Sequence, residues 1–494
     1  MSTIQVSNLT FAYESGGGNI FENVSFRFDT DWRLGFIGRN GRGKTTFLKL
    51  LMGQYEYSGE ITSSVGFEYF PFEVADSSQP SQAAAEGIVP GCESWRLARE
   101  LSALEFDLEA LPRAYATLSL GERTKLLLAA LFLRQEGPAS AGGFLLIDEP
   151  TNHLDLRARQ VTSRYLRSKA GFILVSHDRV FLDSCVDHIL SINKANIEIQ
   201  RGNFTSWQEN KRQRDEFELR ENERLKKDIA RLGKAAARTS GWSDRTEASK
   251  IGRHVGDRGF VGHKAAKMMK RAKNAERRFS LAAEEKAGLL RNLESASPLA
   301  MYPLKHHTRR LVEFKDVSIG YNGRTVCENL NFTLEQGQRL GLTGKNGSGK
   351  SSALKLIMEE AVPHSGSVSC ASGLKISYVP QDTSGLSGSL RDYAEACGID
   401  ATIFMTLLRK LDFTRLQFEK DMRHYSGGQR KKVLLARSLC ERSHLYIWDE
   451  PFNFVDIFSR IQIEELIVQY QPTMLFVEHD LGFVSRAATD TLEL

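Results

Sequence analysis

Two kinds of apolar pattern run along the chain, and they predict different elements. In the first kind, four apolar residues precede an acidic pair, as in FLLIDE at 144–149 and LYIWDE at 445–450. A short, unbroken apolar run of this kind is typical of a parallel strand that is buried on both faces. The sequence therefore predicts two buried strands, each of which brings two carboxylates to its C-terminal tip.

The second kind of pattern has a helical period and lies between residues 204 and 300. On its far side, seven apolar residues follow one another at steps of 4, 3, 4, 3, 7 and 4, the seam of a coiled coil. On its near side only Leu225, Ile229 and Leu232 keep this rhythm, and glycines from Gly241 to Gly262 interrupt the middle. We predict two antiparallel helices joined by a tip loop at about 239–262. The seam consists of Met268, Ala272, Ala275, Phe279, Ala282, Leu289 and Leu293.

Composition and the remaining apolar runs exclude several classes of protein. The chain has 494 residues, of which 41% are hydrophobic and 26% charged, as in soluble multi-domain proteins. Its longest apolar run, at 126–133, is too short to cross a bilayer. The first nine residues lack the features of a signal peptide. We therefore expect a monomeric cytoplasmic protein without a membrane partner.

The net charge of +5 conceals a strong segregation of charge. Between Arg224 and Arg278 there are 17 basic and 5 acidic residues, so this segment carries +12 and the rest of the chain is acidic. Excess charge of one sign repels itself unless a polyanion neutralises it, which favours a nucleic-acid partner. The alternative is the solvated face of a coiled coil.

The chain contains a long internal repeat. The motif GRNGRGKT at 38–45 returns as GKNGSGKS 306 positions later, and LSLGE, FLLIDEP and VSHD return as YSGGQ, LYIWDEP and VEHD at nearly the same offset. The repeat predicts one α/β domain at 1–203, a helical linker at 204–300 and a second α/β domain at 301–494.

Each repeated glycine-rich motif has the pattern of a phosphate-binding loop. Glycines let backbone N–H groups surround phosphate oxygens, the lysine supplies a positive charge, and the hydroxyl after it can bind Mg²⁺. The residues concerned are Gly38, Asn40, Gly41, Gly43, Lys44, Thr45 and Thr46 in the first copy and Gly344, Asn346, Gly347, Gly349, Lys350, Ser351 and Ser352 in the second.

The acidic pairs and a later histidine complete the candidate chemistry. The aspartate of each pair is expected in the Mg²⁺ shell, and the glutamate is placed to polarise an attacking water, although such acids can also cap helices. The histidine after the next strand could donate a hydrogen bond to a γ-phosphate; without the other motifs it would be a core histidine. These residues are Asp148, Glu149 and His177, and Asp449, Glu450 and His479.

In this order the motifs resemble the ATP-binding cassette superfamily. The resemblance implies tandem P-loop cassettes that sandwich two ATP molecules with Mg²⁺ and hydrolyse them. Each phosphate loop would be completed by the serine-glycine motif of the other copy, Ser426, Gly427, Gly428 and Gln429 for the first loop and Ser119, Gly121 and Glu122 for the second. Tyr13 and Tyr321 lie where the superfamily stacks adenine on an aromatic ring; they could equally be ordinary strand aromatics.

Two departures from the superfamily pattern predict unequal sites. A glutamine that binds the metal ion is present as Gln381, but Phe72 stands at the corresponding position of the first copy. The first serine-glycine motif is LSLGE, in which Leu120 replaces a glycine. We therefore expect the two composite sites to differ in turnover, and we doubt that the loop at Phe72 contributes a metal ligand.

Tandem cassettes joined by a basic helical hairpin resemble the ABC-F class of ribosome-associated ATPases, and the tip sequence DRGFVGHK and the motif EPFNFVD resemble its Lsa and Vga group of antibiotic-resistance proteins. The resemblance implies binding at the ribosomal exit site, with the tip near 23S rRNA and P-site tRNA, and protection of the peptidyl-transferase centre from lincosamides, pleuromutilins and streptogramin A. A housekeeping factor of the same class, a transporter ATPase subunit and a DNA-acting ATPase are the alternatives. The tip residues predicted to face RNA are Trp242, Arg245, Lys250, Arg253, Val255, Arg258, Phe260 and Lys264. For the apolar ones among them, the alternative is a small local core that orders the loop.

Overall fold

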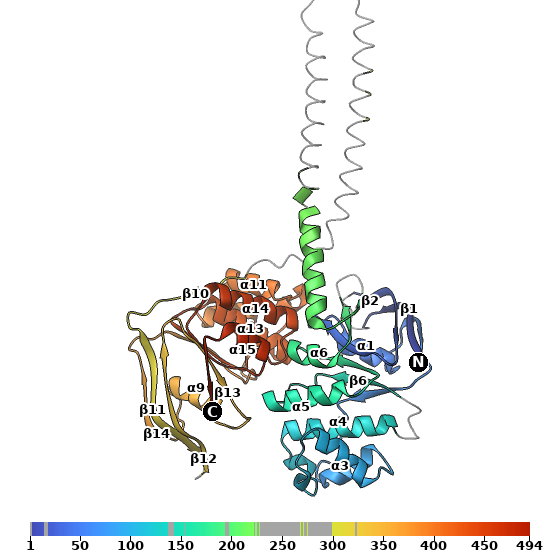
Figure 1. Cartoon of the computed structure of the whole chain (residues 1–494). Coiled ribbons are helices and arrows are strands. Elements are labelled where there is room, and N and C mark those ends of the chain that lie inside the picture. The colour runs from blue at the N-terminus through green and yellow to red at the C-terminus, as the bar shows by residue number, and fades with distance from the viewer. Residues whose placement is uncertain are drawn as a thin grey trace, which may run out of the picture. The chain divides into compact units, whose positions relative to one another are not determined.

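The computed structural model of the chain (Figure 1) describes residues 2–13, 18–136, 143–152, 154–192, 197–221, 299–321 and 324–494, with single positions at 223, 224, 227, 267, 270 and 274. It forms two compact units, one made of Met1–Trp207 with Ser297–Leu494 and the other of Gln208–Ala296. Residues 204–221 are helical. The predicted antiparallel hairpin, its seam and its tip loop fall almost entirely outside the described residues and remain predictions.

The first copy of the repeat is built on a six-stranded sheet with the order β5-β6-β7-β3-β8-β9. Every neighbouring pair is parallel except β8 with β9, and a separate antiparallel sheet has the order β2-β1-β4. The strands are β1 (Thr3–Phe11), β2 (Phe21–Asp29), β3 (Arg33–Gly38), β4 (Ser58–Thr62), β5 (Phe67–Phe70), β6 (Phe144–Asp148), β7 (Phe172–Val175), β8 (His188–Ile192) and β9 (Ile197–Arg201). The helices are α1 (Lys44–Leu51), α2 (Ser81–Ile88), α3 (Ser94–Ala103), α4 (Leu120–Glu136), α5 (Leu156–Arg167) and α6 (Arg179–Cys185), with short 3-10 turns at Leu108–Ala110 and Tyr115–Thr117.

The second copy repeats this plan with a five-stranded parallel sheet, β15-β17-β18-β13-β19, and an antiparallel sheet, β12-β11-β14. The strands are β10 (Tyr302–Pro303), β11 (Arg310–Tyr321), β12 (Arg324–Glu335), β13 (Arg339–Thr343), β14 (His364–Cys370), β15 (Ile376–Val379), β16 (Arg442–Ser443), β17 (Leu445–Asp449), β18 (Met474–Val477) and β19 (Asp490–Glu493). The helices are α9 (Lys350–Ile357), α10 (Leu390–Ala396), α11 (Ala401–Lys410), α12 (Arg415–Glu419), α13 (Gly427–Cys440), α14 (Ile457–Tyr470) and α15 (Leu481–Ala487), with a 3-10 turn at Met422–His424.

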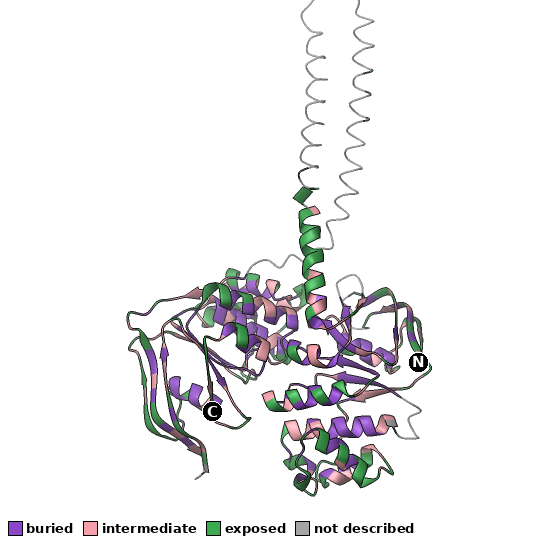
Figure 2. Cartoon of the chain, viewed as in Figure 1, coloured by how far each residue is buried: buried purple, intermediate pink, exposed green. Residues whose placement is uncertain are grey.

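The predicted buried strands are confirmed. β6 and β17 end at Asp148 and Asp449, each lies between two parallel neighbours, and the apolar residues before each aspartate are buried. Figure 2 shows the central strands of both copies as buried ribbons with exposed residues on the outer helices. Because parallel strands end at the same edge of a sheet, the carboxylates emerge where β3 and β13 lead into their glycine-rich loops.

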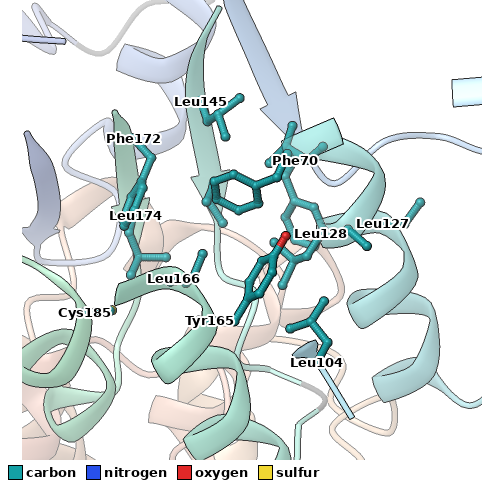
Figure 3. Close-up of a cluster of buried hydrophobic side chains, with 14 of the residues drawn as sticks. Phe70, Leu104, Leu127, Leu128, Leu145, Tyr165, Leu166, Phe172, Leu174 and Cys185 are labelled. Atoms are coloured by element: carbon teal, nitrogen blue, oxygen red, sulfur yellow. The ribbon is translucent and has the colours of Figure 1, made fainter. Parts of the chain in front are cut away.

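The apolar run at 126–133 forms the buried part of α4. Within the described ranges, no helix is long and apolar enough to span a membrane. Figure 3 shows the core that α4 shares with β6, β7 and α5, including Leu127, Leu128, Phe172 and Leu174. This core fixes α4, and with it the LSLGE motif at the start of that helix.

One polar contact in this core supports a stability prediction. The hydroxyl of Tyr165 donates a hydrogen bond to Oε2 of Glu100 at 2.7 Å, and both residues are buried. Tyr165→Phe keeps the ring but removes this donor to a carboxylate, so we expect a loss of about 1.5 kcal/mol in the free energy of unfolding. Urea denaturation measures it. The control Tyr470→Phe, at a half-exposed position, should change stability little, and an equal loss in both variants would contradict the prediction.

Candidate functional site

Each glycine-rich loop wraps around its own lysine. The ammonium of Lys44 donates to the carbonyl oxygens of Gly38 at 2.7 Å and Arg39 at 3.3 Å, and that of Lys350 donates to the Gly344 carbonyl at 3.0 Å. Both lysines are buried. These carbonyl contacts hold the ammonium inside the loop, where phosphate oxygens can replace them.

The loop conformation requires glycine at the residue before each lysine. Gly43 has φ +90°, and a Cβ at that position would lie 2.5 Å from Cγ2 of Ile20. Gly349 has the same left-handed backbone, with φ +93°. The helices α1 and α9 begin directly after these glycines without a side-chain cap, so their first N–H groups are free to bind an anion.

A hydroxyl and a carboxylate meet beside each loop. Thr45 donates its hydroxyl hydrogen to Oδ2 of Asp148 at 3.0 Å, and the Ser351 hydroxyl lies near enough to Asp449 to act against the rise in the pKa of that carboxyl. Burial raises the pKa of both aspartates, and Oδ1 of Asp449 is buried without a hydrogen bond. Such hard oxygen donors, with phosphate oxygens to complete the shell, suit Mg²⁺. Among the described residues, no group of three His, Cys, Asp or Glu side chains could hold a metal ion without such help.

The two glutamates after the aspartates have different surroundings. Glu149 is partly buried, both of its carboxylate oxygens are shielded from solvent without a well-formed hydrogen bond, and His177 Nε2 lies 3.3 Å from Oε1. Glu450 accepts hydrogen bonds from Nε2 of Gln381 at 2.8 Å and Nδ2 of Asn453 at 2.5 Å. The orphaned oxygens of Glu149 fit a site that a water molecule or phosphate completes.

These surroundings move the two pKa values in opposite directions. Burial, and then the charge of Asp148, raise the pKa of Glu149 to about 8. Burial also raises the pKa of Glu450, but His479 and the hydrogen bonds from Gln381 and Asn453 outweigh it and lower this pKa to about 2. The two copies therefore differ in the electrostatics of their glutamates, while the predicted difference in turnover stays a prediction.

The serine-glycine motifs form the first turns of α4 and α13. Ser426 and Gln429 bond reciprocally as a capping box, and Ser119 with Glu122 makes the same pair of bonds at 3.2 and 2.7 Å. At the first loop, Nδ2 of Asn40 donates to the Phe454 carbonyl at 2.7 Å. A Cβ at Gly428 would collide with that carbonyl and would lie 2.8 Å from the Asn40 amide nitrogen. The serine-glycine motif of the second copy therefore lies against the phosphate loop of the first copy.

The two candidate adenine-stacking tyrosines are held in the same way. The hydroxyl of Tyr13 bonds to Oγ1 of Thr46 at 2.8 Å, and that of Tyr321 bonds to Oγ of Ser352 at 2.9 Å. Both side chains are 41% exposed. Each ring is therefore tethered to its phosphate loop while remaining accessible, although its contact with adenine stays a prediction.

Comparison with known proteins identifies the family. The ABC transporter family model matches residues 21–152 and again residues 327–453, more than half of the chain. The chain belongs to the ATP-binding cassette family. Its two copies are therefore ATP-binding cassettes, and the protein is an ATPase. In such cassettes, bound ATP supplies the phosphoanhydride bond that is cleaved and Mg²⁺ supplies the Lewis acid.

Similar proteins indicate which class of ATP-binding cassette proteins the chain resembles. The chain is 28% identical to the Bacillus subtilis ribosome protection protein VmlR, over 97% of this chain and 85% of that protein. It is 29% identical to the ATP-binding protein Uup of Caulobacter vibrioides, covering 97% and 75%, and 24% identical to the translational throttle protein EttA of Haemophilus influenzae, covering 96% and 89%. These similarities indicate the ABC-F class, while the finer Lsa and Vga assignment is supported only through VmlR.

A solved structure shares the tandem-cassette fold. The archaeal ribosome recycling factor aABCE1, in complex with ribosomal stalk protein aP1, matches with a TM-score of 0.64 over 98% of this chain and 87% of that chain. At 18% sequence identity, this likeness shows the fold alone.

Three polar residues beside the cassette carboxylates escaped the sequence prediction. Tyr69 donates to Asp148 at 3.0 Å, Asn453 donates to Glu450, and Lys431 donates to the Asp449 carbonyl at 3.2 Å. Tyr69 aligns with Tyr378 and Asn453 with Asn152, so comparing the two cassettes column by column could have found these two, but Lys431 aligns with Thr124 and gives no such signal.

The two departures from the family pattern have clear structural settings. The Phe72 ring packs against the core with the Arg134 guanidinium 5.8 Å from its centroid, and it offers no metal ligand. Leu120 is 52% exposed at the start of α4. The predicted RNA-facing tip residues, Trp242, Arg245, Lys250, Arg253, Val255, Arg258, Phe260 and Lys264, lie outside the described residues.

Proposed function

We propose that this ATPase binds the ribosome in the cytoplasm and protects the peptidyl-transferase centre from antibiotics. The observation that carries the proposal is the likeness to a ribosome protection protein along nearly the whole length of this chain, including the linker between the cassettes. That linker has the +12 segment, which suits a channel lined by RNA phosphates. In this proposal, ATP closes the cassettes, the closed form binds at the exit site, and hydrolysis releases it.

The hairpin tip is the proposed effector. It would reach toward 23S rRNA and P-site tRNA and displace lincosamides, pleuromutilins or streptogramin A compounds. Its apolar residues could stack on bases while its arginines neutralise phosphates. The drug spectrum would depend on where a few tip atoms come to rest.

Ribosome binding is tested by pelleting 70S particles with the purified chain in ATP or ADP over a KCl series. Binding should require ATP and weaken as salt rises. Arg245→Gln with Arg258→Gln should reduce the slope of log affinity against log salt by about 2. Arg391→Gln with Arg415→Gln removes the same charge from exposed cassette positions and should leave the slope unchanged. Absence of pelleting with any nucleotide would sink the proposal.

A housekeeping translation factor is the second candidate, and the likeness to the translational throttle protein favours it. Both candidates predict ribosome binding, so drug susceptibility separates them. Expression in a susceptible host should raise resistance to the three drug classes. Deletion of residues 241–262 should abolish this protection while ATP turnover of the purified variant persists; resistance unchanged by expression would favour the housekeeping role.

A further inference from the structure

The first cassette has a polar contact on its metal-shell carboxylate that its repeat lacks. Tyr69 and Thr45 both donate hydrogen bonds to Oδ2 of Asp148, each at 3.0 Å. In the second cassette, Tyr378 holds the place of Tyr69. Within the described part of the chain, however, Tyr378 donates no hydrogen bond to Asp449, whose Oδ1 is buried and unpartnered.

Strand pairing aims the Tyr69 phenol at this carboxylate. β5 lies parallel to β6 with Tyr69 opposite Leu146, and side chains two residues apart on a strand share a face. Leu146 packs in the core that also contains α1, so Tyr69 and Asp148 lie on the face that carries the phosphate loop. Phe70 points to the opposite face and is buried in the other core. The contact thus follows from the register of the sheet.

The same strand leads to the position where the cassette lacks its glutamine. In the second cassette, Gln381 follows β15 and donates to Glu450 at 2.8 Å. In the first cassette, Phe72 packs on the apolar core below Arg134 instead. Tyr69 lies on the same strand, three residues before Phe72. Its hydroxyl is the polar group that this strand places in contact with a carboxylate of the first site.

We propose that Tyr69 is a positioning residue for the first ATP site, holding Asp148 in the orientation that receives the divalent cation. A partner of this kind restricts the carboxylate to one rotamer before the metal arrives, which raises metal affinity. In the second site a different contact orients a carboxylate, the hydrogen bond that Gln381 donates to Glu450. This proposal concerns the ATP sites and does not depend on ribosome binding.

The test measures Mn²⁺ affinity at one site at a time. In a Lys350→Ala background, which weakens nucleotide binding at the second site, Tyr69→Phe should lower Mn²⁺ affinity roughly tenfold in the presence of a non-hydrolysable ATP analogue. Electron paramagnetic resonance of free Mn²⁺ reports it. Binding of the same analogue in EDTA should be unchanged, because the loop and Lys44 are intact.

The repeat supplies the matched control. Tyr378→Phe in a Lys44→Ala background should leave Mn²⁺ affinity within twofold of its parent. Phenylalanine keeps the ring at either position, and thermal denaturation checks that each variant is folded. Equal losses from both tyrosine substitutions, no loss from Tyr69→Phe, or an equal loss of analogue binding in EDTA would each overturn the positioning role.

Discussion

Replacing both glutamates together, Glu149→Gln with Glu450→Gln, should lower ATP turnover by about 10²-fold or more while ATP still binds. Each glutamate follows the metal-shell aspartate and has a histidine beside it, with Nε2 to Oε1 distances of 3.3 Å for His177 and 3.7 Å for His479. An amide has nearly the same shape but cannot accept the proton of an attacking water. Phosphate release measures turnover, and a fluorescent ATP analogue measures binding.

The two glutamates should set the rate at which the chain dissociates from the ribosome, because they are needed for hydrolysis of the bound ATP. If the proposed ribosome cycle is correct, the double variant remains on ribosomes in ATP after the parent chain has dissociated. Glu395→Gln is the control, since it makes the same chemical change at an exposed position on α10. Turnover that stays within a few-fold of the parent would contradict the assigned chemistry; normal turnover loss with normal release would contradict only the ribosome cycle.

Removing one buried cation from the second cassette should be the most destabilising single change predicted here. Lys432 and Asp456 are 3% and 0% exposed, with Nζ 2.5 Å from Oδ2, and Lys432 also donates to the Leu411 carbonyl at 2.8 Å. Lys432→Met leaves a buried carboxylate without its counter-charge. We expect a loss of about 3–5 kcal/mol in the free energy of unfolding, measured by urea denaturation.

The same ion pair predicts a pH dependence. Burial raises the pKa of Asp456, but the charge of Lys432 outweighs it and leaves the folded-state pKa lowered. The stabilisation is therefore complete above the pKa of an unfolded aspartate, about 4, and is lost as the pH falls from there toward the folded-state value. In Lys432→Met this dependence should weaken or reverse.

The first cassette again provides the control. Lys125, the counterpart of Lys432, is only partly buried and donates to the Glu105 carbonyl at 3.2 Å. Lys125→Met should cost about 1 kcal/mol or less. Equal losses from the two lysine substitutions would show that the Lys432–Asp456 ion pair is not the cause.

Motif chemistry made the cassettes and their loops predictable. A run of four apolar residues before Asp148 or Asp449 is typical of a buried parallel strand, and the left-handed backbone before Lys44 requires glycine. The contact of Tyr69 with Asp148 could not be predicted in this way, because a period of two fixes the face of a side chain but not its partner. Asn453 lies in the turn after β17, where no strand period applies. The Asn40 contact with Phe454 joins residues 414 positions apart, and no local pattern encodes it.

The buried guanidinium of Arg159, on α5, donates to Asp178 at 2.9 Å and to the backbone carbonyl of His479 at 3.0 Å. The backbone of the histidine that follows β18 is thus held by a side chain encoded 320 codons upstream. A gene fragment carrying only the second cassette would keep Lys350, Asp449 and Glu450 yet lose this anchor. A nonsense mutation between the two cassettes would leave only the first, whose phosphate loop would then lack the contact of Asn40 with the Phe454 carbonyl.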